Sequence, residues 1–171
     1  MAHSIEIRAG RLLEVSLGGT LDVEEVAELM DALDAAIGKA TFVPVIVVSD
    51  WRWLHLMSHE ASEQLLTRIK RANPRIARAA ALASSDSPVA ALQFARLLQA
   101  TNHATRRLFY DPDALVDWLE QVLVEPEIER LHEVVGAWLG AADLGHAPPD
   151  GRGGQTAVGP LNARFHPRGI L

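Results

Sequence analysis

The chain has 171 residues, of which 49% are hydrophobic and 22% charged, and this composition is typical of one globular domain. No apolar run approaches the roughly 18 residues that a membrane-spanning helix needs, so we expect no membrane span. The chain contains no cysteine, which excludes disulfides, thiolate zinc sites and cysteine nucleophiles. The first residues lack the basic and apolar regions of a signal peptide, which predicts a cytoplasmic protein.

The net charge of −6 is unevenly distributed, because residues 1–143 are acidic and residues 144–171 carry an excess of arginine. An acidic body lacks the positive field that attracts phosphate groups. We therefore expect no nucleic-acid partner.

The first half of the chain begins as a hairpin. Apolar residues alternate with polar ones over residues 5–7 and again over residues 13–17, which predicts two antiparallel strands joined at Gly10. Asp22 followed three residues later by Glu25 predicts a capping box and a helix that ends near residue 38.

The segment 43–48 is an unbroken, mostly β-branched run, which predicts a strand buried on both faces of a parallel sheet. A loop with two tryptophans follows, and then Ser58 is in position to cap a helix that ends near Pro74. The alanine-rich segment 76–83 favours a helix locally, yet an alternating chain requires a strand there, and a strand is our prediction.

The remaining segments continue the alternation. A helix is expected over 88–101, a short strand over 106–109, and a helix that starts at Asp111-Pro112. The predicted architecture is an α/β fold with a mixed sheet, in which an N-terminal antiparallel hairpin is followed by parallel strands and crossover helices. A further amphipathic helix from Glu127 needs a surface to cover, either on the body of the protein or on a partner.

Three features together resemble the SpoIIAA-like branch of the STAS superfamily. They are the glycine-bounded second strand, the apolar strand that ends in Ser49-Asp50, and the block from Phe109 to Leu119 with its Phe, acidic turn, Ala and Trp-Leu. The resemblance covers about residues 4–124. It implies a bacterial, non-enzymatic regulatory or protein-interaction domain with a mixed sheet.

This resemblance divides the chain into three parts. We expect residues 1–124 to form the STAS-like domain, residues 125–143 an amphipathic helical extension, and residues 144–171 a flexible Gly/Pro-rich tail.

The resemblance also bears on phosphorylation. STAS-type antagonists carry a phosphorylatable serine at the start of the helix after the third strand, behind an aspartate at the strand end. Asp50 matches that aspartate, but the acceptor position falls on His59, and Ser58 stands one residue early. Ser58 is therefore a helix cap and a candidate phospho-acceptor.

Ligands of open α/β sheets collect outside the carboxyl ends of the parallel strands. The segment Trp51 to Met57 lies there and is rich in the Trp and Arg that anchor interfaces. Two readings stay open, an exposed binding surface or tryptophans that fold back into the core. The predicted partner or ligand rim consists of Asp50, Trp51, Arg52, Trp53, His55, Ser58, His59, Ser84 and Ser85.

Metal binding and catalysis find little support. His59 and Glu63 share a helical face, but Glu63 occupies the place where the His-Glu-x-x-His zinc motif has its second histidine. The chain also lacks a Gly-x-Ser-x-Gly elbow, a Gly-x-Gly-x-x-Gly loop and a phosphate loop. We expect no metal, no cofactor and no catalytic residue.

The predicted function is a regulatory or interaction domain that contacts a protein partner, or a second copy of itself in an oligomer, through the Trp51–Ser58 rim and the C-terminal extension. The alternative is a domain that binds a small apolar ligand or lipid, since the SpoIIAA-like branch is similar in shape to CRAL-TRIO lipid-transfer domains. In the tail, residues 157–161 resemble the cargo-loading peptides of encapsulin shells, which adds such a shell as a candidate partner.

Overall fold

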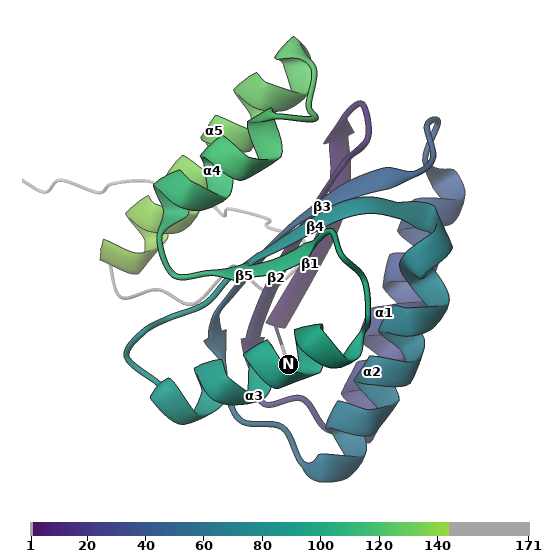
Figure 1. Cartoon of the computed structure of the whole chain (residues 1–171), viewed down its shortest axis with the longest axis vertical. Helices are drawn as coiled ribbons and strands as arrows, with labels where there is room; N and C mark the ends of the chain where they lie inside the picture. Colours follow the sequence, from purple (N-terminus) through teal and green to yellow (C-terminus); the bar gives the residue numbers. More distant parts are fainter. Residues whose placement is uncertain (1, 144–171) are drawn as a thin grey trace, which may run out of the picture.

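The computed structural model describes residues 2–143, which form a five-stranded sheet with helices on both faces (Figure 1). The strands stand side by side in chain order, with the first pair antiparallel and all later pairs parallel. This arrangement confirms the predicted mixed sheet and the predicted order of elements. The strands are β1 (Ala2–Ala9), β2 (Leu12–Gly19), β3 (Val45–Leu54), β4 (Ile76–Leu82) and β5 (Arg106–Phe109). The helices are α1 (Val23–Lys39), α2 (His59–Ala72), the short 3-10 helix η1 (Asn73–Arg75), α3 (Pro88–Ala100), α4 (Pro112–Glu120) and α5 (Glu125–Asp143).

The sheet order explains how the helices are distributed. Parallel strands that follow one another are joined by right-handed crossovers, so sequential crossovers along a sheet fall on the same face. Helices α1, α2 and α3 accordingly cover one face, and α4 with α5 covers the other (Figure 1). The sheet is buried on both sides, as the unbroken apolar run in β3 predicted.

Local signals in the sequence account for several element boundaries. The Asp22 side chain accepts a hydrogen bond from the Glu25 N–H at 2.8 Å, and the Glu25 carboxylate accepts one from the Asp22 N–H at 3.0 Å, so the predicted capping box of α1 is confirmed. The alanine-rich segment is strand β4, as predicted. Its place between β3 and β5 prevails over the helical preference of alanine, because both of its edges are hydrogen-bonded.

Strand β3 is longer than predicted, and the expected tryptophan loop is wrong for residues 51–54. The strand continues past the end of β4 because Trp53 and Leu54 pair with Gly18 and Gly19 at the end of β2. The His55 N–H then donates to the Gly19 carbonyl at 2.8 Å. The extent of β3 is therefore set by its pairing with β2, and the local sequence pattern of β3 does not show this pairing.

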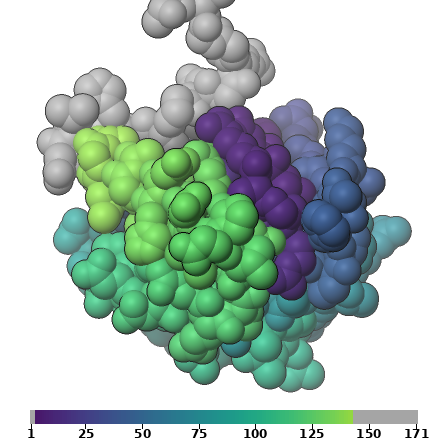
Figure 2. Space-filling model, turned by 90° about the horizontal axis from the view of Figure 1, so that it is seen from above, coloured from purple at the N-terminus to yellow at the C-terminus, as the bar shows by residue number. Residues whose placement is uncertain are grey.

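Helix α5 covers the sheet of its own chain. Leu131 is fully buried, and Val135 and Trp138 lie with it against Leu12 and the other apolar side chains of this face. The sequence left open whether this helix packs on the body of the protein or on a partner. In the structure it packs on the body of the protein. Figure 2 shows α5 beside β1 on the molecular surface, although about a hundred residues separate them in the chain.

Polar contacts fix the start of α5 on the hairpin. The Glu127 carboxylate accepts hydrogen bonds from the Arg11 N–H at 2.7 Å and from the Val124 N–H at 3.1 Å. Gly10 lies in the turn with a φ of +49°, and a Cβ there would come within 2.3 Å of Glu127 Oε1. Glycine is therefore required at the point where the hairpin turn meets the helix. Farther along, the Arg130 guanidinium donates two hydrogen bonds of 2.7 Å to the Glu14 carboxylate.

Within residues 2–143, every helix is too short or too polar to cross a membrane. The predicted tail and the cargo-peptide resemblance at 157–161 lie outside the described residues.

Candidate partner-binding groove

The predicted rim residues separate into an interior group and a surface group. Asp50 pairs across the sheet with Leu82, the last residue of β4, but it does not end its own strand, since β3 continues to Leu54. Its carboxylate is buried and accepts hydrogen bonds from Arg52 Nε at 2.9 Å and Nη2 at 2.8 Å. The same guanidinium donates to the Trp138 carbonyl of α5 at 2.9 Å. The pair is turned toward α5, and its hydrogen-bonding groups are used within the chain.

Trp51 points to the opposite face of the sheet and belongs to the core. Its side chain is 7% exposed, and its ring meets the Phe94 ring edge to face, with 5.4 Å between the centroids. Of the two readings that the sequence left open, the core reading holds for this tryptophan. Trp53, near the end of the strand, is only half-buried.

The remaining rim residues are at the surface. Ser58 is exposed and caps α2, because its hydroxyl accepts a hydrogen bond from the Ala61 N–H at 3.1 Å. His55 and His59 are exposed on either side of it. In the segment between β4 and α3, the Ser84 hydroxyl accepts a hydrogen bond from the Asp86 N–H at 3.1 Å, and Ser85 is exposed. The cap residue of α3 is Ser87.

A groove of about 490 Å³ lies between α2 and α3, next to this surface group. Three large apolar side chains line it while open to solvent, namely Leu56 at 49%, Val89 at 65% and Leu92 at 51% exposure. We call it the α2–α3 groove. Its walls are formed by Leu56, His59, Ser62, Glu63, Leu66, Val89, Leu92, Gln93, Arg96, Leu97 and Ala100. Figure 1 shows the two helices side by side on the same face of the sheet.

One end of the groove is held in shape by a side chain of α3. The Gln93 amide accepts a hydrogen bond from the Met57 N–H at 3.0 Å and donates one to the Met57 carbonyl at 2.9 Å. These two bonds satisfy both polar groups of one loop residue and join the segment before α2 to α3. The apolar Leu56 is thereby presented on the surface at the end of the groove.

The α3 side of this site was missed by the sequence interpretation. A signal was present, since Val89 and Leu92 are apolar on a helix whose other side already supplies buried Ala90, Phe94 and Leu97. A helix with apolar residues on two sides needs a partner for each of those sides. The spacing of apolar residues within α3 does not show, however, that α2 leaves the side with Val89 and Leu92 uncovered.

Glu63 on α2 and Arg96 on α3 bring opposite charges to the groove, and the imidazole of His59 also lines it. This mixture of signs suits a polar rim around an apolar centre, the arrangement of protein interfaces. In the described part of the chain, three or more metal-ligating side chains are nowhere gathered closely enough to hold an ion.

Comparison with known proteins identifies the fold. No protein-family model matches the chain, and no curated protein matches it. Among solved structures, the chain is similar to an uncharacterized protein of the DUF3478 family with a SpoIIAA-like fold from Shewanella loihica PV-4, at 19% identity and a TM-score of 0.51, over 69% of this chain and 93% of that one.

Two further similarities are to the anti-sigma factor antagonist SpoIIAA in its unphosphorylated form and to an anti-sigma factor antagonist from Mycobacterium paratuberculosis. The first is 15% identical with a TM-score of 0.46, over 72% of this chain and 100% of that chain. The second is 17% identical with a TM-score of 0.45, over 70% of this chain and 92% of that chain. The predicted SpoIIAA-like fold is thus confirmed.

Proposed function

We propose that this chain, which has a SpoIIAA-like fold, is a non-enzymatic regulatory domain that binds an amphipathic helix of a protein partner in the α2–α3 groove. The observation that carries the proposal is the gathering of three exposed apolar side chains, Leu56, Val89 and Leu92, in one groove. Burying such a side chain gains about 1.5–3 kcal/mol. Exposed apolar clusters of this kind are typical of interaction sites.

The shape of the site supports a helix as the occupant. An apolar groove between two helices accepts the apolar face of a third, with anchors spaced three and four residues apart. Glu63 and Arg96 stand on opposite walls, so a partner helix with one basic and one acidic edge finds both charges. The apolar side of α5 is already packed on the sheet, which favours the groove over the C-terminal helix as the contact surface.

Ser58 gives this proposal a candidate control point. It is exposed, begins the segment that leads into α2, and is followed by His59, which lines the groove. A phosphate on its hydroxyl would add a charge of about −2 beside the groove and lie at the positive end of a helix. We propose that phosphorylation at Ser58 changes the affinity for the partner.

The test compares two charge substitutions in the full-length chain. Leu92→Asp places a carboxylate inside the groove, and Val124→Asp places one at an equally exposed apolar residue (57%) between α4 and α5. Tagged proteins are incubated with a lysate of the source organism, and the bound proteins are quantified by mass spectrometry. We expect specific proteins to be retained by the original chain and by Val124→Asp and lost with Leu92→Asp.

The same bound set for all three chains would overturn the proposal. Both substituted residues are exposed, so the thermal unfolding midpoints should stay close to that of the original chain and exclude misfolding as the cause. Ser58→Glu should shift the retained amount of the same proteins. If Leu92→Asp instead converts an oligomer into a monomer in light scattering, the occupant is a second copy and not a separate partner.

A further inference from the structure

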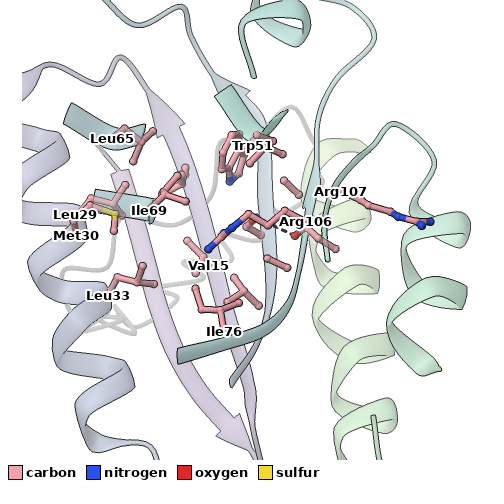
Figure 3. A pocket seen from close by; sticks show the side chains of 17 residues that line it. Val15, Leu29, Met30, Leu33, Trp51, Leu65, Ile69, Ile76, Arg106 and Arg107 are labelled. Atoms are coloured by element: carbon pink, nitrogen blue, oxygen red, sulfur yellow. Dashed lines mark hydrogen bonds between the residues drawn. The ribbon is translucent and has the colours of Figure 1, made fainter. Parts of the chain in front are cut away.

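A small apolar cavity that is partly open to the surface lies beneath α2. It has a volume of about 70 Å³ and is bounded by the sheet and by α1 and α2 (Figure 3). Leu29, Met30 and Leu33 reach it from α1, and Leu65 and Ile69 from α2. We call it the sheet cavity; it is separate from the α2–α3 groove.

The sheet cavity exists because β4 supplies small side chains on this face. Ala79 pairs with Val47, and Ala81 pairs with Ser49, so methyl groups stand where the neighbouring strand has larger side chains. The hydroxyl of Ser49 donates to the Ala80 carbonyl at 3.0 Å, which leaves this wall without a free donor. The helices above cannot sink into the gap because they rest on the bulkier residues of β2 and β3.

One cation enters this apolar space. Arg106 of β5 points into the sheet cavity, and the next residue, Arg107, points the other way (Figure 3), with its guanidinium 5.0 Å from the Trp118 ring centroid. Arg106 donates from Nε at 3.2 Å and from Nη2 at 2.9 Å to the same oxygen, Oδ1 of Asn73. Its Nη1 has no hydrogen-bond partner among residues 2–143.

Arg106 differs from Arg52 and Arg130, two other arginines that are partly withdrawn from solvent. Arg52 is paired with the Asp50 carboxylate and Arg130 with that of Glu14. Within residues 2–143, Arg106 has no carboxylate partner and is held only by the Asn73 amide oxygen. Burial lowers its pKa to about 10, the direction expected for a cation whose desolvation is not compensated by an anion. An arginine stays charged at neutral pH all the same.

The guanidinium also borders the outside. Arg106 and Leu98 line a second, open groove of about 600 Å³, along β5 and the C-terminal end of α3. Asn102, His103 and Tyr110 form other parts of that groove. A ligand can therefore reach Arg106 from solvent at the edge strand, because this residue lines both the groove and the sheet cavity.

We propose that the sheet cavity binds a small carboxylate with a short apolar chain, whose carboxylate pairs with Arg106 and whose chain lies among Leu29, Leu65 and Ile69. The carboxylate would supply the anion that the guanidinium lacks, in a charge-assisted and bidentate contact. Size limits the ligand to a chain of about two or three carbons, since a cavity of about 150 Å³ binds benzene and the sheet cavity has less than half of that volume, about 70 Å³. A long fatty acid would have to push the helices apart. This site is independent of the proposed partner groove.

The test measures propionate and propan-1-ol binding to the full-length chain by calorimetry and by the shift of the thermal unfolding midpoint. The two probes share the same short carbon chain and differ in the charge of the head group. We expect saturable binding of propionate at the sheet cavity and binding of propan-1-ol that is at least about tenfold weaker, because the alcohol cannot form an ion pair with the guanidinium. Equal affinity for both, or no binding of propionate, would overturn the proposal.

Variants locate the site. Arg106→Met should weaken propionate binding at least about tenfold, whereas Arg107→Met should leave it unchanged, because the Arg107 guanidinium lies at the Trp118 ring and not in the cavity. Arg106→Met should also raise the unfolding midpoint without ligand, since it removes an uncompensated charge from an apolar space. Ala81→Val fills part of the cavity while keeping Arg106 and should abolish binding. Unchanged affinity in Arg106→Met or Ala81→Val would contradict the assignment. Leu92→Asp should bind propionate normally, so the partner proposal and this one fail separately.

Discussion

Ser58 is exposed and also caps α2, since its hydroxyl accepts a hydrogen bond from the Ala61 N–H in the first turn of the helix. Ser58→Ala should lower the free energy of unfolding by about 1 kcal/mol, the usual cost of removing such a cap. Ser58→Asp keeps an acceptor and should retain most of the stability. Urea denaturation of the three chains provides the measurement, and a loss in Ser58→Asp as large as in Ser58→Ala would contradict the capping role.

At the same scale, burial separates residues that the sequence pattern grouped together. Trp51 and Arg52 are neighbours in the chain, but successive side chains of a strand point to opposite faces of the sheet. Trp51 therefore packs on Phe94 of α3, while Arg52 pairs with Asp50 beneath α5. Neither provides the exposed contact that a loop would have given them.

Helix α5 depends on Glu127 at its start, and this element should respond to acid. Burial by itself raises the pKa of Glu127, but hydrogen bonds from the backbone N–H groups of Arg11 and Val124, together with the Arg11 guanidinium, outweigh burial and hold the pKa below its ordinary value of 4.5. A carboxyl group with a lowered pKa stabilises the fold above its unfolded pKa and loses that contribution as the pH falls through the folded value.

The unfolding free energy should therefore begin to fall near pH 4.5 and continue to fall at lower pH, and Glu127→Gln should show a shallower dependence in this range. Urea denaturation between pH 7 and pH 3 measures both curves. Glu133→Gln provides the control, because Glu133 is also on α5 but its side chain is 66% exposed. Identical slopes for Glu127→Gln and the original chain would contradict this account.

At the scale of the whole molecule, the sheet has two apolar faces and α5 helps to cover the second. In a chain that ends at Leu123, α5 is missing. The fully buried Leu12 and Ile46 and the apolar side of α4 would then lose part of their cover. We expect this truncated chain to be unfolded or associated, because a large apolar surface would face water. A truncation after Asp143 keeps α5 and should stay folded.

Circular dichroism and light scattering of the two truncated chains decide this point. A folded, monomeric chain ending at Leu123 would show that α5 is an accessory element. A folded chain ending at Asp143 beside an unfolded shorter one would show that residues 125–143 belong to the folding unit.

The sequence by itself determined the order of elements and the mixed sheet, because these depend on local periodicity, on caps such as Asp22 and Ser58, and on the handedness of crossovers. It predicted Asp50 at the end of the third strand, whereas β3 continues to Leu54 because it pairs with the end of β2. Its resemblance to the SpoIIAA-like branch led to the fold that the structural comparison supports.

Only the tertiary structure decided which surfaces remain open. The α2–α3 groove depends on the distance between two helices, and the sheet cavity depends on alanines of β4 facing helices from distant parts of the chain. The isolation of Arg106 has the same origin, since a missing carboxylate is visible only when all neighbours in space are known. Periodicity records which side of an element is apolar, but packing between elements determines whether that side is covered.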